Sequence, residues 1–221
     1  MTPEQDALLK KFAEAVLTAP AHYHLTSDRD FQLFWNRHIQ DAIKLHDLIP
    51  AESKRPSNKI LDIGSGNGIP GIPISILEPN WEIDLLDSDN KKCGFLDAFC
   101  KSNAINNVHV IADRAEALAK TDKRASYYMV FARALSKLRT TLELAGAFLK
   151  VGGLLIVPHG TTWEAELEGA SNAAKKMGLK FKESIEYKLG GISFWALQFL
   201  KVAETPNIYP RDNNNPVKRP L

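Results

Sequence analysis

A carboxylate and three glycines lie close together in the run Asp62-Ile63-Gly64-Ser65-Gly66-Asn67-Gly68. The apolar residues Lys59–Ile63 predict a buried strand, and a helix is expected from about Pro70. Glycine allows the tight turn between such a strand and helix, and it lets the backbone approach a ligand closely. The spacing Gly66-x-Gly68-x-x-Gly71 also matches a dinucleotide-binding fingerprint, so the loop alone predicts a nucleotide-like ligand without fixing its class.

Two acidic residues help to separate the ligand classes. Asp62 lies at the carboxyl end of the strand, where its charge would repel a pyrophosphate and attract a ligand that carries an ammonium and a sulfonium. Asp87 closes the next apolar run about twenty residues after the glycines, a distance typical of acids that bind ribose hydroxyls. The alternative for Asp87 is a helix N-cap. Together the two acids favour S-adenosyl-L-methionine over a nicotinamide dinucleotide.

The third apolar run, Val108–Ile111, ends at Asp113-Arg114-Ala115-Glu116. This position suits contacts with the edge of an adenine, chiefly through backbone amides. An exposed loop that holds an Arg–Glu ion pair explains the same residues, and the sequence leaves both interpretations open.

The sequence shows no Ser-His-Asp, Cys-His or paired-carboxylate arrangement, so no catalytic residue is predicted. The six histidines have no metal-binding spacing, and no metal is expected. Cys93 and Cys100 also lie outside metal-binding spacings and are expected to be reduced thiols.

Seven short apolar runs alternate with segments of helical character, which is typical of a doubly wound, mostly parallel α/β sheet. The last two runs follow each other across Gly190-Gly191, as in an antiparallel hairpin. The predicted strands are Lys59–Ile63, Trp81–Leu86, Val108–Ile111, Tyr127–Ala132, Leu154–Val157, Phe181–Tyr187 and Phe194–Leu200.

Three parts of the chain differ in character. Residues 1–58 predict a helical extension that begins with a capping box at Thr2, and its polar end, residues 51–58, is expected to be a loop. Residues 59–203 form the predicted α/β domain, and the proline-rich residues 204–221 are expected to be an irregular tail.

The composition is ordinary for a globular protein, with 44% hydrophobic and 24% charged residues among 221. A net charge of +2 and a pI of about 8.4 do not by themselves indicate a nucleic-acid-binding protein. The acidic N-terminus does not resemble a secretory signal, and no run reaches the roughly 18 apolar residues of a membrane span. A cytoplasmic location is expected.

Several motifs match one family together: Arg37-His38-x-x-Asp41, Asp62-x-Gly64-x-Gly66-x-Gly68-x-Pro70-Gly71-Ile72-Pro73, Leu85-Leu86-Asp87-Ser88, Arg114-Ala115-Glu116, Ala132-Arg133-Ala134 and Tyr209-Pro210-Arg211. With these motifs the chain resembles the RsmG (GidB) family, bacterial methyltransferases of guanine N7 in 16S ribosomal RNA. The similarity extends from about residue 24 to residue 221. It implies a seven-stranded Rossmann-like methyltransferase sheet, S-adenosyl-L-methionine as cofactor, and the small ribosomal subunit as partner, with neither DNA nor a membrane involved. A monomer is expected.

The resemblance implies cofactor contacts at Gly64, Ile69, Ala115, Glu116 and Arg133. We also expect cofactor contacts at Gly66 and Gly68, because they belong to the glycine loop, and at Asp87, because its spacing suits ribose hydroxyls. The residues expected to contact RNA are Arg37 and His38 from the resemblance, and Lys92 and Arg114 from their charge. The aromatic candidates for stacking on an RNA base are Tyr23, Trp35, Trp163 and Trp195. The chain departs from the family pattern at His159-Gly160, where lysine is usual, and at Lys91-Lys92, where the second residue is usually arginine.

Other functions also fit the sequence. A methyltransferase of this kind could act on a small molecule or a protein, or the chain could be a catalytically silent, ribosome-associated module that binds the cofactor. A dehydrogenase is the weakest alternative.

Overall fold

The computed structural model describes residues 1–54 and 58–221. Seven strands form one sheet in the order β3-β2-β1-β4-β5-β7-β6. The first five strands of that order are parallel, and β7 runs antiparallel to both of its neighbours. The predicted doubly wound α/β class is therefore confirmed. The strands are β1 (Lys59–Ile63), β2 (Glu82–Asp87), β3 (Val108–Ala112), β4 (Tyr127–Phe131), β5 (Leu149–His159), β6 (Leu179–Leu189) and β7 (Ile192–Lys201).

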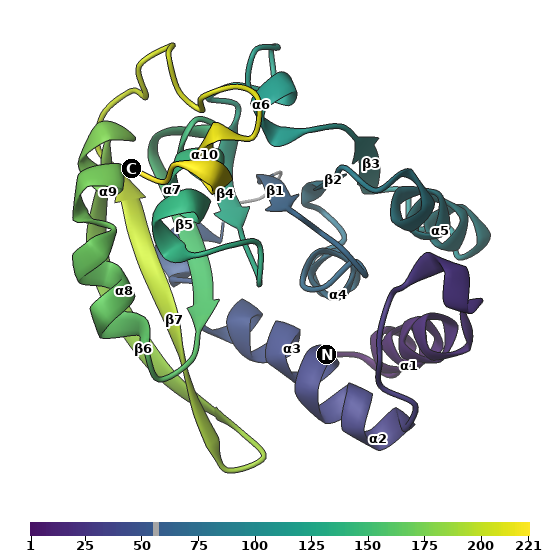
Figure 1. Ribbon diagram of the computed structural model, residues 1–221. Coiled ribbons are helices and arrows are strands. Elements are labelled where there is room, and N and C mark those ends of the chain that lie inside the picture. Colours follow the sequence, from purple (N-terminus) through teal and green to yellow (C-terminus); the bar gives the residue numbers. More distant parts are fainter. Residues whose placement is uncertain (55–57) are drawn as a thin grey trace.

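Both faces of the sheet are covered by helices (Figure 1). Successive residues of a strand point to opposite faces, so Ile60 and Met129 join one apolar core while Leu61 and Val130 join the other. This burial explains why the parallel strands are near-continuous apolar runs in the sequence. The helices of the α/β part are α4 (Gly71–Leu77), α5 (Asn90–Ser102), α6 (Ala115–Leu118), α7 (Leu138–Gly146), α8 (Trp163–Gly169) and α9 (Ser171–Lys176).

The N-terminal extension is helical and packs on the face that α4 and α5 cover (Figure 1). Its first helix starts with the predicted capping box, in which the Thr2 hydroxyl accepts from Gln5 N and the Gln5 side chain accepts from Thr2 N. Phe12 is fully buried in the core shared with the sheet, so the extension is continuous with the α/β part. Its elements are α1 (Pro3–Thr18), α2 (Phe31–Phe34), a π-helical turn (Trp35–Ile39), α3 (Gln40–Asp47), and 3-10 turns at Ala21–Tyr23 and Ala51–Ser53. Residues 55–57 of the predicted loop lie outside the described residues.

The C-terminal tail differs from the prediction of an irregular segment, because it contains one helical turn, α10 (Asn215–Lys218). It crosses back over the same end of the molecule as α6 and α7 (Figure 1). Arg211 of the tail donates from Nε and Nη2 to the fully buried Glu143 of α7, at 2.8 and 2.6 Å. No helix within the described ranges combines the length and the apolar character that a membrane span requires.

Candidate functional site

The glycine loop is anchored to the neighbouring strand. The backbone amides of Gly64 and Ser65 both donate to Leu86 O of β2, at 2.8 and 3.0 Å. Gly66 has φ +55°, a left-handed conformation that glycine adopts without steric cost. A Cβ added at Gly66 would find only Gly64 O within 4 Å, so the loop leaves open space beside this residue.

A first cavity of about 450 Å³ opens beside this loop, where β1, β2, β3 and β4 end. Such a position at the carboxyl ends of parallel strands is where open α/β sheets bind ligands. It brings together most of the residues expected to contact the cofactor or RNA: Gly64, Gly66, Ile69, Asp87, Lys92, Arg114, Ala115, Glu116 and Arg133.

Gly68 does not line this cavity. Its φ is +87°, and a Cβ there would lie 2.6 Å from Leu96 Cδ2 and 3.2 Å from Phe12 Cζ. Glycine at this position therefore permits close packing of the loop against α5 and α1. The structure gives Gly68 a packing role, in contrast to the predicted cofactor contact.

Asp87 holds the loop while facing the first cavity. Its Oδ2 accepts from Gly66 N at 2.8 Å, and its Oδ1 accepts from Asp89 N at 2.9 Å. The N-cap of α5 is Asp89, whose carboxylate accepts from Lys91 N and Lys92 N. The alternative that Asp87 serves as the N-cap is therefore wrong.

Asp62 is placed differently from the expectation that it faces a cationic ligand. Its side chain is buried beneath the loop, and its Oδ2 accepts from Gly71 N at 2.8 Å. Burial, which outweighs the Gly71 hydrogen bond and the charge of Arg133, raises the pKa of Asp62 to about 7. Asp62 is not among the residues that line the first cavity, and its hydrogen bond is to Gly71 at the start of α4.

The Arg–Glu ion pair expected at the third strand end is present, and the adenine contact stays a prediction. Arg114 Nη2 donates to Glu116 Oε1 at 3.0 Å, so the Arg–Glu pair is present, and both residues also line the first cavity. Arg114 Nη2 further donates to Asn214 Oδ1 at 3.1 Å. Asn214 and Val217 of the tail complete this wall, which the sequence did not predict because nothing local links residues a hundred positions apart.

A second cavity of about 410 Å³ adjoins the first. The two cavities share the segment Arg133–Ser136, which follows β4. The second cavity has apolar walls from Val157, Pro158 and Phe194. Its polar lining residues are His38, Asp41, Arg133, Ser136, Thr141, His159 and Tyr187.

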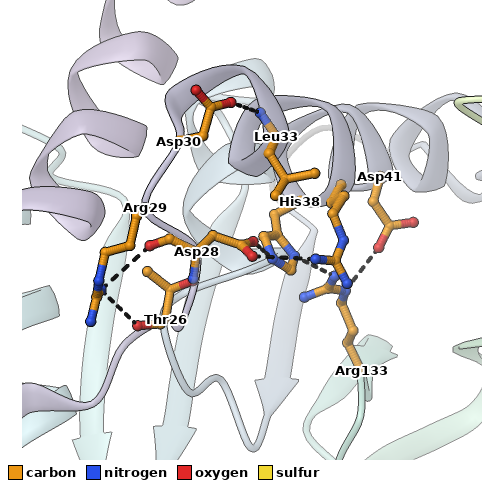
Figure 2. Close-up of polar contacts among 9 residues, drawn as sticks. Thr26, Asp28, Arg29, Asp30, Leu33, His38, Asp41 and Arg133 are labelled. Atoms are coloured by element: carbon orange, nitrogen blue, oxygen red, sulfur yellow. Dashed lines mark hydrogen bonds and ion pairs between the residues drawn. The ribbon is translucent and has the colours of Figure 1, made fainter.

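Arg133 is held by the N-terminal extension (Figure 2). Its Nε donates to Asp41 Oδ2 at 2.8 Å, and its Nη2 donates to His38 Nδ1 at 2.8 Å. Behind them, His38 Nε2 lies 3.0 Å from Asp28 Oδ2, and Tyr187 OH donates to Asp41 Oδ1 at 2.7 Å. Burial and the charge of Arg133 outweigh Asp28 and lower the pKa of His38. The sequence motif Arg37-His38-x-x-Asp41 contains two residues of this cluster, His38 and Asp41. The motif does not show that Arg133 is their partner.

The remaining predicted residues line neither cavity. Arg37 is 60% exposed and pairs with Asp28 at 3.2 Å. Trp35 is buried against Phe31, and Trp163 packs between Phe181 and Trp195. Tyr23 packs against Phe95. In the part of the chain that the structure describes, the aromatic side chains on the cavity walls are Tyr187 and Phe194, in place of the four expected stacking residues.

His159, at the position where the family usually has lysine, lies in the second cavity. Its Nδ1 is 3.2 Å from Gly160 O and its Nε2 is 3.5 Å from Glu166 Oε2. Glu166 also accepts from Leu138 N at the start of α7. Within residues 1–54 and 58–221, no group of three or more His, Cys, Asp and Glu side chains is arranged to hold a metal ion.

Solved structures with this fold include a protein in complex with AdoMet and a methylase. TYW2 of M. jannaschii, in complex with AdoMet, superposes with a TM-score of 0.58 at 16% identity, over 75% of this chain and 76% of that one. The ribosomal protein L11 methylase of Lactobacillus delbrueckii subsp. bulgaricus superposes with a TM-score of 0.53 at 13% identity, over 79% and 80% of the two chains. At these identities the likeness establishes the seven-stranded Rossmann-like fold.

Sequence comparisons identify the family. The model of the GidB family, rRNA small subunit methyltransferase G, matches residues 5–190. Ribosomal RNA small subunit methyltransferase G of Pseudothermotoga lettingae is 37% identical over 214 residues, covering 96% of this chain and 90% of that protein. The protein of the same name from Fervidobacterium nodosum is 33% identical over 219 residues, covering 99% of each. The chain therefore belongs to the GidB family of rRNA small subunit methyltransferase G enzymes.

Proposed function

We propose that this chain transfers a methyl group from S-adenosyl-L-methionine to N7 of a guanine in 16S ribosomal RNA of the small subunit. The observation that carries this proposal is the pair of adjoining cavities that meet along Arg133–Ser136. A methyl donor in the first cavity and a base in the second would meet across this shared segment.

The residues of the first cavity fit the methyl donor. The open space beside Gly66 accommodates a ligand against the backbone, and the adjacent Asp87 carboxylate retains acceptor capacity for ribose hydroxyls. The loop at Ala115 and Glu116 suits an adenine edge, and Arg133 suits the carboxylate of the methionine part. The first cavity also has apolar walls from Ile69 and Leu144.

The second cavity fits a splayed base. Phe194 lies on its wall and is stacked with Tyr187, at a ring separation of 5.9 Å, so it offers an aromatic surface to a base. The exposed cations near the cavities supply contacts to RNA phosphates. They are Arg37 beside His38, Lys91 next to Lys92 at the start of α5, and Lys218 and Arg219 after Val217.

The proposed chemistry requires no general base. Guanine N7 carries a lone pair and no proton, and S-adenosylmethionine supplies an electrophilic methyl group whose S–C bond breaks with its electron pair returning to sulfur. The chain contributes position, because alignment of the reacting atoms supplies most of the acceleration in such a transfer.

The experiment uses small ribosomal subunits from a strain that lacks the corresponding gene. Purified protein and labelled S-adenosylmethionine are added, and the RNA is mapped by N7-specific strand cleavage. We expect one new cleavage site in 16S RNA. A Gly64→Asp variant, which crowds Leu135 and the first cavity, should lose the signal, while Gly94→Asp, on an open surface of α5, should keep it.

Two negative outcomes have different meanings. If S-adenosylhomocysteine binds but no label enters subunits or naked RNA, the acceptor is a small molecule or a protein, or the chain is catalytically silent. If S-adenosylhomocysteine does not bind, the assignment of the first cavity is wrong.

A further inference from the structure

We propose that Asp28 and His38 of the N-terminal extension are positioning residues that fix the Arg133 guanidinium at the boundary between the two cavities. This inference rests on the proposed function, because that function has Arg133 bind the carboxylate of the cofactor. His38 lines the second cavity, and Asp28 contacts His38 without lining either cavity. It makes the helical extension part of the catalytic site.

The partners of His38 select one of its tautomers. The Arg133 guanidinium has donors only, so the His38 Nδ1 that lies 2.8 Å from its Nη2 must present a lone pair. Asp28 has acceptors only when ionised, so the His38 Nε2 that lies 3.0 Å from its Oδ2 must carry the proton. Both contacts therefore require the same neutral imidazole.

Charge and burial around His38 favour this neutral form. The groups that face it are Asp28 from the preceding loop, Arg37 from the same helical turn, and Arg133 from the segment after β4. Burial and the two arginines together outweigh Asp28, and the pKa of His38 is lowered. Protonation would place a donor on Nδ1 opposite the donor of Arg133, and the hydrogen bond between them would be lost.

The second anchor of Arg133 is Asp41, three residues after His38 on the same side of the helix. It accepts from Arg133 Nε, and Tyr187 of β6 holds its other oxygen. Two of the three guanidinium nitrogens are thus fixed from the extension. Among the described residues no protein partner is found for Arg133 Nη1, which leaves this donor for a ligand in either cavity.

The test measures S-adenosylhomocysteine affinity by titration calorimetry, together with kcat and KM for methyl transfer. We expect His38→Ala to weaken this affinity about tenfold, the effect of losing one hydrogen bond to a charged group. His38→Asn should restore most of the loss, because its amide oxygen can take the place of Nδ1. The matched control is His46→Ala, since His46 also pairs with a carboxylate, Glu78 at 2.7 Å, but lines neither cavity.

The pH dependence separates a positioning role from a merely structural one. In the wild type, affinity should fall as the pH drops through the lowered pKa of His38, below its usual value of about 6.5. In His38→Asn this part of the acid limb should disappear, because the amide does not titrate. This comparison remains available if His38→Ala does not fold.

The inference is overturned if the wild type binds S-adenosylhomocysteine while His38→Ala and His46→Ala both retain its affinity. It is equally overturned if His38→Asn keeps the acid limb of the wild type. Failure of the wild type itself to bind would instead contradict the proposed function, so the two failures are distinct.

Discussion

The carboxylate of Asp62 lies beneath the glycine loop, 1% exposed, with one oxygen bonded to Gly71 N and the other without a partner among the described residues. A carboxylate in such a place is costly to ionise, which is why its pKa rises to about 7. Because ionising this buried carboxylate is costly, we expect that the fold does not require its negative charge.

We predict that the difference in unfolding free energy between Asp62→Asn and the wild type shifts in favour of the variant as the pH rises, because the stability of the wild type falls. At pH 5 the folded wild type holds Asp62 protonated while the unfolded chain has ionised it, so stability falls as the pH increases toward 7. The amide keeps the acceptor for Gly71 N and cannot ionise. Urea unfolding at pH 5 and pH 8 should show the difference shifting toward the variant by up to about 3 kcal/mol. An unchanged difference would mean that Asp62 is ionised without cost.

At the residue scale, the sequence predicted the cavity-lining side chains well where a strand end determines their place. Asp87 and Glu116 follow predicted strands, and parallel strands end at one edge of the sheet, so both line the first cavity. The direction in which a side chain points was harder to predict. Asp62 belongs to the same edge but turns beneath the loop, because its neighbour Gly71 has an amide that needs an acceptor.

At the scale of elements, the loop contains one glycine that lines the first cavity, Gly66, and one that packs against α5 and α1, Gly68. Gly66→Ala should cost little stability beyond the strain of its left-handed backbone, about 1 kcal/mol, yet weaken S-adenosylhomocysteine binding. Gly68→Ala should unfold at a lower temperature, because its methyl group would overlap Leu96 and Phe12 at a cost of about 1–3 kcal/mol beyond the strain. Thermal unfolding and calorimetry measure both effects. Equal stability losses in the two variants would contradict this division.

Strands could be predicted from the sequence where a short apolar run is bounded by polar or turn-forming residues. All seven strands were predicted, but β5 begins at Leu149, five residues earlier than expected. Its first part contains Gly152-Gly153, which resembles a turn in sequence, and its register against β4 shifts there. The π-helical turn that presents His38 was also not foreseen, since its residues have no distinctive period.

At the scale of the whole molecule, the tail closes the wall of the first cavity, and the Arg211–Glu143 ion pair ties it to α7. Arg211→Ala would leave the fully buried Glu143 without its charged partner, and we expect a loss of about 3–5 kcal/mol in urea unfolding. Because Asn214 and Val217 follow Arg211, S-adenosylhomocysteine affinity should fall as well. Glu143→Ala should cost less, since Arg211 is 28% exposed and can be hydrated. The reverse order would indicate that the pair does not hold the tail.

The contacts between residues far apart in the chain could not be predicted from the sequence. Arg133 meets His38 across 95 positions, and Arg114 meets Asn214 across 100. Each depends on the order of strands in the sheet and on the return of the tail, which no local pattern encodes. Composition was equally uninformative, because a net charge of +2 conceals the cations near the two cavities.

In the proposed function, donor and acceptor occupy adjoining cavities that meet at Arg133–Ser136. The most direct measurement is calorimetric binding of a bisubstrate analogue, an adenosyl group joined through a short linker to N7 of guanosine. We predict that it binds about tenfold or more tighter than S-adenosylhomocysteine. Phe194→Ala in the second cavity should weaken the analogue alone, and Asp87→Ala in the first should weaken both ligands. An analogue that binds no tighter than S-adenosylhomocysteine, with an affinity that Phe194→Ala leaves unchanged, would show that the second cavity does not bind the base.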